Sequence, residues 1–144
     1  MGAHPLGAES VNAPGVGCGA AILREGSLLL VKRLKDSEAG HWNLPGGKVE
    51  FGEHAADAAQ REIAEELGVE IVVTRLLGVV EILGEGHHWV SPIFAATILA
   101  GEPVNAEPDK HEAILWAPLD APPRPLSRAA LYAIDALVRR ARSA

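Results

Sequence analysis

The segment from Gly47 to Val69, GKVEFGEHAADAAQREIAEELGV, constrains this chain more strongly than the rest of the sequence. It predicts a helix over about residues 54 to 67, and at about 100° per residue the carboxylates of Glu62, Glu65 and Glu66 fall within an arc of about 100°. Three carboxylates this close repel one another unless a positive charge lies among them. A divalent cation is the obvious candidate, and carboxylates around such a cation suggest phosphate chemistry.

The residues around this helix favour a site over an ordinary solvated acidic face. Glu53 lies at the predicted start, where negative charge suits the helix dipole, and Gly68 lies where a helix normally ends. Arg61 is spaced i,i+4 from Glu65 and could hold that acid in place. The preceding Pro45-Gly46-Gly47 could be a plain turn, or it could bring a backbone carbonyl close to a metal. A separate apolar arc is expected to pack on a sheet and consists of Ala56, Ala59, Ile63 and Leu67.

The rest of the chain alternates strand and helix patterns. Of 144 residues, 1 to 14 are expected to be a flexible tail and 15 to 144 a single domain. Residues 15 to 33 have the pattern of a hairpin, and Pro45-Gly46-Gly47 should stop a short extended piece that begins at Trp42. The other predicted elements are strands over 70–83, 88–99 and 112–117, and a helix over 126–141.

Composition excludes several classes of protein. Hydrophobic residues make up 48% of the chain, which is typical of a globular protein, and the apolar runs are too short to cross a membrane. A net charge of -6 without a dense basic run argues against a nucleic-acid polymer as partner, although a small anion could still bind locally. The N-terminus lacks a signal-peptide pattern and Cys18 is the only cysteine, so a cytoplasmic location is expected.

The segment resembles the box of the Nudix, or MutT-like, hydrolases. Every specified position of the box is matched, by Gly47, Glu53, Arg61, Glu62, Ile63, Glu65, Glu66, Gly68 and Val69. A looser likeness extends from about Val16 to Trp116. The resemblance implies an α/β/α sandwich with a mixed sheet between helices. It also implies cleavage of a nucleoside diphosphate linked to a further group, with Mg²⁺ or Mn²⁺ as cofactor.

The resemblance also implies roles for individual residues. Glu62, Glu65 and Glu66 match the metal-binding and catalytic glutamates, and Glu53 matches a glutamate that supports or joins the site. Arg61 matches the arginine that orients the glutamates, while Gly46 lies where a backbone carbonyl often binds metal. The general base stays open between a box glutamate and a glutamate of a later loop. Glu112 is the preferred later candidate, including as a metal ligand, followed by Glu107.

A narrower likeness favours a nucleoside triphosphate as substrate. Segments such as Leu44-Pro45-Gly46-Gly47 and Glu107-Pro108-Asp109-Lys110 are similar to the Nudix branch that releases nucleoside monophosphate and pyrophosphate. Dinucleoside polyphosphate hydrolases tend to carry a tyrosine after the box, and ADP-ribose pyrophosphatases a proline, whereas residues 83–88 are LGEGHH. The alternatives are hydrolysis of ADP-ribose, a nucleotide sugar or another such diphosphate, and a Nudix module that senses a nucleotide without cleaving it.

Several further residues have two interpretations each. Arg33 could contact a substrate phosphate or be a solvated strand end, and Trp42 could stack on a base or anchor the core. Gly47 is expected to let the substrate approach the backbone closely. The adjacent His87 and His88 are too few ligands for a zinc site. Residues 126–137 are expected to pack as an outer helix or to form the face of a homodimer.

Overall fold

The computed structural model describes residues 12–35 and 38–143. Most of the predicted tail, residues 1–11, lies outside the described residues, as do residues 36–37 and 144. The division into a tail and one domain therefore stays a prediction.

Within the described ranges, seven strands form one mixed sheet. The strands are β1 (Gly15–Arg24), β2 (Ser27–Arg33), β3 (Trp42–Asn43), β4 (Gly46–Lys48), β5 (Glu70–Gly84), β6 (His87–Ala100) and β7 (His111–Pro118). Their order is β3-β2-β1-β6-β5, with β4 pairing with β1 and β7 pairing with β2. Strand β1 runs parallel to β6, and the other pairs are antiparallel. The predicted hairpins β1–β2 and β5–β6 are confirmed.

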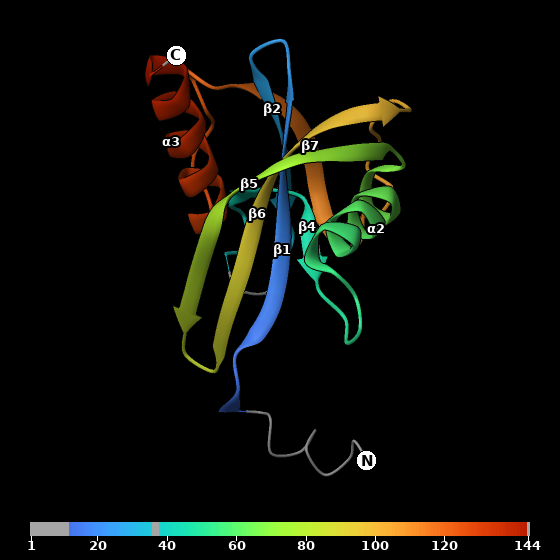
Figure 1. Cartoon of the computed structure of the whole chain (residues 1–144), viewed down its shortest axis with the longest axis vertical. Helices are drawn as coiled ribbons and strands as arrows, with labels where there is room; N and C mark the ends of the chain where they lie inside the picture. Colours follow the sequence, from blue (N-terminus) through green and yellow to red (C-terminus); the bar gives the residue numbers. More distant parts are fainter. Residues whose placement is uncertain (1–11, 36–37, 144) are drawn as a thin grey trace.

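Two helices in the described part of the chain, α2 (Ala55–Leu67) and α3 (Arg128–Ser143), flank the sheet on opposite sides (Figure 1). Each helix buries its own apolar side chains against different residues of β1 and β2. Ile63 and Leu67 of α2 pack with Ile22, while Ala130 and Ala133 of α3 belong to a second buried cluster. This arrangement confirms the predicted α/β/α sandwich. No helix in the described ranges is long and apolar enough to cross a membrane.

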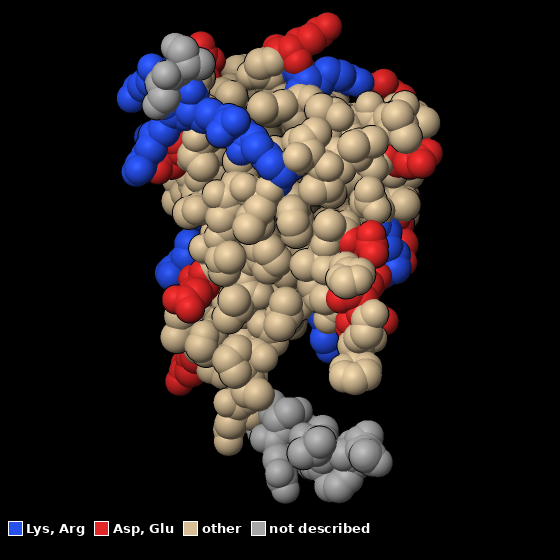
Figure 2. Space-filling view, in the orientation of Figure 1, with Lys and Arg blue, Asp and Glu red and all other residues tan. Residues whose placement is uncertain are grey.

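The charged side chains on the face shown in Figure 2 lie mainly along its rim. The middle of this face, over β1 and the β5–β6 hairpin, is largely uncharged. Exposed apolar side chains of β1 and β5 include Val16, Val79 and Leu83. Arginines gather at the far end of α3, where Arg140 and Arg142 occupy the last turn. No continuous basic surface crosses this face, which agrees with the overall negative charge.

The Pro-Gly-Gly segment is more than the predicted stop, because Gly46–Lys48 pairs with β1 as strand β4. Gly19 lies opposite Gly46, and Cys18 lies opposite Gly47. A side chain at Gly46 would overlap the Cys18 carbonyl and approach the Gly19 Cα to 2.8 Å, so only glycine permits this pairing. The pairing places the backbone of β4 against the second half of α2, where Gly46 contacts Glu66 and Gly47 lies against Glu62.

Helix α2 begins at Ala55 and ends at Leu67, with Gly68 as its C-cap, close to the predicted bounds. Gly68 takes the left-handed conformation with a φ of 69°, and its N–H donates to the Ala64 carbonyl, as expected of a helix end. Ala59, Ile63 and Leu67 are buried as predicted. Ala56 is only partly buried, and Ala58 takes its place on the fully buried side.

Candidate active site

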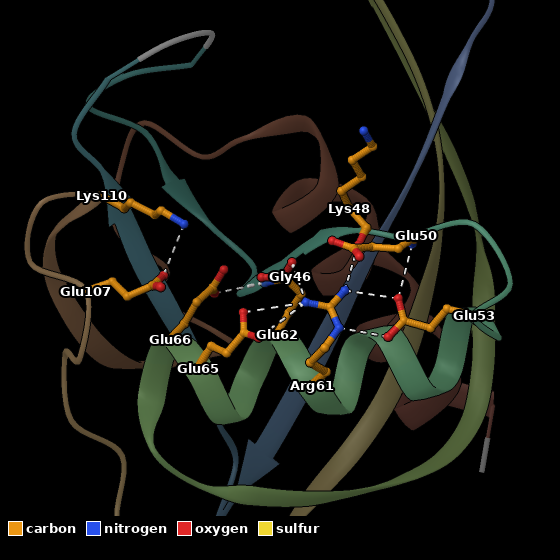
Figure 3. A network of polar contacts seen from close by, with 10 residues as sticks. All are labelled: Gly46, Lys48, Glu50, Glu53, Arg61, Glu62, Glu65, Glu66, Glu107 and Lys110. Atoms are coloured by element: carbon orange, nitrogen blue, oxygen red, sulfur yellow. Dashed lines mark hydrogen bonds and ion pairs between the residues drawn. The ribbon is translucent and has the colours of Figure 1, made fainter. Parts of the chain in front are cut away.

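A single guanidinium, that of Arg61, contacts three of the four box glutamates (Figure 3). Two parallel hydrogen bonds join it to Glu53, from Nε to Oε2 at 2.8 Å and from Nη2 to Oε1 at 3.0 Å. Its Nη1 lies 3.3 Å from Glu62 Oε2 and 3.4 Å from Glu65 Oε2, so the predicted i,i+4 pair is present. Nη2 also donates to the Lys48 carbonyl at 3.1 Å. Arg61 therefore supplies positive charge to Glu53, Glu62 and Glu65.

The Glu53 carboxylate binds the loop before α2. It does not interact with the start of the helix, where the sequence analysis had placed its charge. His54, the residue after it, is the N-cap of α2, and the Glu53 carboxylate turns back to accept the Glu50 N–H at 3.1 Å. The hydrogen bonds from Arg61, together with the Glu50 N–H, hold the pKa of Glu53 below its usual value. Hydrogen bonding to Glu53 is in turn the main cause that raises the pKa of Arg61. The two residues thus fix the loop to the helix as a charged pair.

Glu66 occupies a different environment from the other box glutamates. It is only 4% exposed, and its Oε1 accepts the Gly46 N–H at 3.2 Å. Burial, followed by the negative charge of Glu62, raises the pKa of Glu66 to about 8. The Glu62 carboxylate lies against Gly47, where any side chain would overlap it. Strand β4 and the last turns of α2 therefore bring two acids together at one buried position.

These two acids form one wall of a cavity of about 530 Å³, a size suited to a small molecule. Gly46 and Gly47 line the same wall. Arg33 and His111, which are paired across β2 and β7, line another part of the cavity. The apolar lining comes mainly from Leu44, Ile82, Trp89 and Ile93. The cavity therefore combines an acidic wall, cationic groups and an apolar surface.

Five predicted site residues do not line this cavity: Glu53, Arg61 and Glu65, which ion pairs through Arg61 join to the lining residue Glu62, and also Trp42 and Glu112. The register shift between Lys32 and Arg33 leaves Glu112 out of the paired ladder, and its exposed carboxylate lies 3.8 Å from the Lys32 Nζ. Trp42 packs into the core cluster beside α3, and its backbone binds the segment that leads into that helix. The core interpretation of Trp42 and the solvated interpretation of Glu112 fit these contacts.

Glu107 is the later glutamate that lies near the box. Its carboxylate is 3.5 Å from the Lys110 Nζ, and its charge contributes to the raised pKa of Glu66. Figure 3 shows Glu107 and Lys110 beside Glu66. The register shift between β2 and β7 leaves no mark in the residue pattern. The sequence alone therefore could not show that Glu107, and not Glu112, lies near the box.

Other cavity residues had little signal in the sequence. Asn43 lines the cavity, and its Oδ1 accepts hydrogen bonds from the Leu44 N–H at 2.8 Å and the Ser127 hydroxyl at 2.6 Å. Trp89 also lines it. Alternation along a strand could have indicated Asn43, since neighbours in a strand face opposite ways and Trp42 faces the core.

The acidic wall has the chemistry of a site for a hard divalent cation. Among residues 12–35 and 38–143, no three His, Cys, Asp or Glu side chains already converge as a metal site, and Arg61 lies against Glu62 and Glu65. All the donors are oxygens, as Mg²⁺ prefers. Glu66 is a buried carboxyl with a raised pKa, and it lies beside a second acid, Glu62. A bound cation would stabilise the ionised form of both carboxyls. The residues therefore fit such an ion.

Comparisons with known proteins agree with this fold and site. A family model of the NUDIX domain matches residues 13–137. The crystal structure of a MutT NUDIX hydrolase from Burkholderia pseudomallei superimposes with a TM-score of 0.83 at 48% identity, covering 86% of this chain and 98% of that one. The chain therefore belongs to the NUDIX family, and its predicted class, a Nudix pyrophosphohydrolase, is confirmed.

Relatives within the family carry different substrate names. The CTP pyrophosphohydrolase of Escherichia coli K12 is 35% identical over 126 residues, which is 83% of this chain and 87% of that protein. The ADP-ribose pyrophosphatase of Methanocaldococcus jannaschii is 36% identical over 102 residues, or 69% of this chain and 60% of that protein. The substrates that these two names give differ in the group attached to the diphosphate. The comparisons therefore do not decide which nucleotide this chain cleaves.

Proposed function

We propose that this protein hydrolyses a nucleoside triphosphate, ordinary or oxidised, to nucleoside monophosphate and pyrophosphate in a reaction that depends on Mg²⁺. The observation that carries the proposal is the buried Glu66, beside Glu62, on the wall of a cavity of nucleotide size. The 35% identity to a CTP pyrophosphohydrolase supports the triphosphate branch. The alternative substrates are ADP-ribose, a nucleotide sugar or a related diphosphate, and the identity to an ADP-ribose pyrophosphatase keeps them open.

Four groups of this chain would hold the cation, namely the carboxylates of Glu62, Glu65 and Glu66 and the backbone carbonyl of Gly46. Mn²⁺ would substitute for Mg²⁺ at such an oxygen site. A bound divalent ion would neutralise diphosphate charge and lower the pKa of an attacking water. Arg61 and Glu53 orient the acids through the contacts described above.

A later-loop glutamate is proposed as general base, and Glu107 takes the place that the sequence gave to Glu112. Glu107 lies next to Glu66, whereas Glu112 lies in solvent beside Lys32. A box glutamate is the alternative base. Proton removal by such a carboxylate contributes on the order of 10²–10⁴ in rate.

The cavity provides groups for each part of a nucleotide. Gly47 leaves room for phosphates next to Glu62, and Arg33 presents a cation to them. Leu44, Trp89 and Ile93 provide an apolar surface for a base, with the Asn43 amide at the same cavity. For Trp42 we propose the core role over the predicted substrate role, because it packs partly buried against the core cluster and does not line the cavity.

The remaining predictions concern the ligand of this protein and its assembly. We propose a small nucleotide as the ligand and no nucleic-acid polymer. Helix α3 buries Ala130, Ala133 and Leu137 in the core and is thus an outer helix of the sandwich. Its exposed Leu131 and Tyr132 would be available to a homodimer, which light scattering on a sizing column would detect.

One panel tests this function. The wild type and Glu65→Gln are given nucleoside triphosphates, oxidised triphosphates, ADP-ribose and nucleotide sugars with Mg²⁺, and the released phosphates are separated. We expect pyrophosphate from a triphosphate, almost none in EDTA, and loss of most turnover in a folded Glu65→Gln. Turnover that persists in EDTA would exclude the metal mechanism. Calorimetric binding of a nucleotide without any pyrophosphate release would favour the sensing module.

A further inference from the structure

Four buried polar atoms without a hydrogen-bond partner gather at one place beside the cavity. Among the described residues they are Arg33 Nε, Asn105 Oδ1, Glu107 Oε1 and His111 Nδ1. The backbone of His111 lies between them, because its N–H donates to the Glu107 carbonyl at 3.1 Å and its carbonyl accepts the Asn105 amide at 2.8 Å. Arg33 is paired with His111 across β2 and β7. Buried polar groups usually have partners, so this cluster calls for an explanation.

Arg33 Nε is the obligate donor among these atoms, and of the acceptors His111 Nδ1 belongs to the residue that pairs with Arg33 across β2 and β7. The Nε–H of Arg33 can only donate a hydrogen bond, and His111 Nδ1 accepts one when the neutral imidazole carries its proton on Nε2. Burial is the main cause that lowers the pKa of His111, and the charge of Arg33 lowers it further, which favours the neutral ring. Both residues line the cavity, and His111 is only 7% exposed.

We propose that His111 is a positioning residue for Arg33, with one buried water that accepts the Arg33 Nε–H and donates to His111 Nδ1. A guanidinium held at Nε keeps its plane fixed and leaves both terminal amino groups free for a phosphate in the cavity. The proposal rests on the proposed function, since Arg33 is the group that it places against the substrate. The proposal concerns the part of the cavity that Arg33 and His111 line, and not the part that Glu62 and Glu66 line.

The other charged groups around His111 do not take the place of Arg33 as the proposed partner of its ring. Glu107 Oε1 lies 3.5 Å from the Lys110 Nζ, and the Glu107 charge raises the pKa of His111, which opposes the effects of burial and of Arg33. Asp109 and Lys110 influence the ring only through charge, and they do so in opposite senses. Arg33 is the Cα partner of His111 in the β2–β7 pairing, and its charge acts on the His111 ring.

Two substitutions separate positioning from simple packing. His111→Asn places an acceptor near the position of Nδ1, whereas His111→Gln places its polar atoms near that of Nε2. We measure kcat and KM with the best triphosphate of the panel, in the wild-type and Arg33→Met backgrounds. In the wild-type background we expect His111→Gln to raise KM about tenfold with kcat nearly unchanged, and His111→Asn to stay within about threefold of wild type.

In the Arg33→Met background, His111→Gln should have no further effect on KM, because its partner is absent. Equal effects of Asn and Gln, or KM increases that multiply in the double variant, would overturn the proposal. Urea unfolding of both His111 variants serves as the control for packing, and we expect the same stability for the two.

A second measurement does not depend on turnover. Long-range nitrogen–proton NMR spectra of the free, full-length protein report the tautomer of His111, with the resonance assigned by its loss in His111→Asn. We expect the Nε2–H tautomer and an Nδ1 resonance that moves in Arg33→Met. A proton on Nδ1, or an Nδ1 resonance unaffected by Arg33→Met, would refute the pairing. If the wild type cleaves no triphosphate while this signature is present, the proposed function fails and the pairing stands.

Discussion

Replacing Glu66 with glutamine should stabilise the metal-free protein at neutral pH. Burial and the charge of Glu62 raise the pKa of Glu66 to about 8 in the folded protein, against an ordinary value of 4.5. The folded protein thus binds this proton more tightly than the unfolded chain does. The corresponding stability is fully present below about pH 4.5 and is lost as the pH rises through about 8.

The magnitude follows from the difference between the two pKa values. At about 1.4 kcal/mol per pKa unit, the free energy of unfolding falls by about 3 kcal/mol between pH 4.5 and pH 7, and by about 5 kcal/mol above pH 8. Glutamine has the same shape, remains neutral and can still accept the Gly46 N–H. In EDTA, Glu66→Gln should therefore be about 3 kcal/mol more stable than wild type at pH 7, and within about 1 kcal/mol at pH 5.

Urea unfolding followed by tryptophan fluorescence at pH 5, 7 and 8.5 in EDTA measures these differences. Glu65→Gln is the matched control, because its side chain is half exposed and should change stability by less than about 1 kcal/mol. Equal stabilities of wild type and Glu66→Gln at both pH 7 and pH 8.5 would refute the description of Glu66 as a buried acid that carries an ionisation penalty.

Four further substitutions test the site. Gly47→Ala places a methyl group on the Glu62 carboxylate, so kcat/KM should fall at least tenfold while circular dichroism stays native. Glu107→Gln should lower kcat by on the order of 10²–10⁴, whereas Glu112→Gln should leave steady-state kinetics within about threefold of wild type; the reverse pattern would restore the sequence-based assignment. Arg61→Lys keeps the charge but cannot form two parallel hydrogen bonds, so we expect kcat to fall about tenfold and urea unfolding to show a loss of about 1–2 kcal/mol. Wild-type kinetics in Arg61→Lys would show that the acids need no such orientation.

The sequence predicted the elements that carry a strong local signal. The hairpin patterns, the apolar side of α2 and the glycine that ends this helix all have periodicities or residue types that few other structures allow. The positions of Glu62 and Glu66 at the cavity follow from the same helical period.

What the sequence missed depends on contacts between distant segments. Strand β4 forms because Gly46 can approach Gly19 without a side chain, and its own three residues show no strand pattern. The different surroundings of Glu107 and Glu112 depend on a register shift opposite Arg33. Tertiary pairing decides such features, so no pattern within one segment reveals them.

Proton release on metal binding tests the central claim most directly. With a pKa of about 8, about nine-tenths of Glu66 is protonated at pH 7, and a divalent ion must displace that proton to bind the carboxylate. Calorimetric titration of the protein with Mg²⁺ at pH 7, in buffers of different ionisation enthalpy, should show release of about one proton per site in the wild type and almost none in Glu66→Gln. Binding of Mg²⁺ without proton release, or equal release from both proteins, would contradict a cation site built on Glu66.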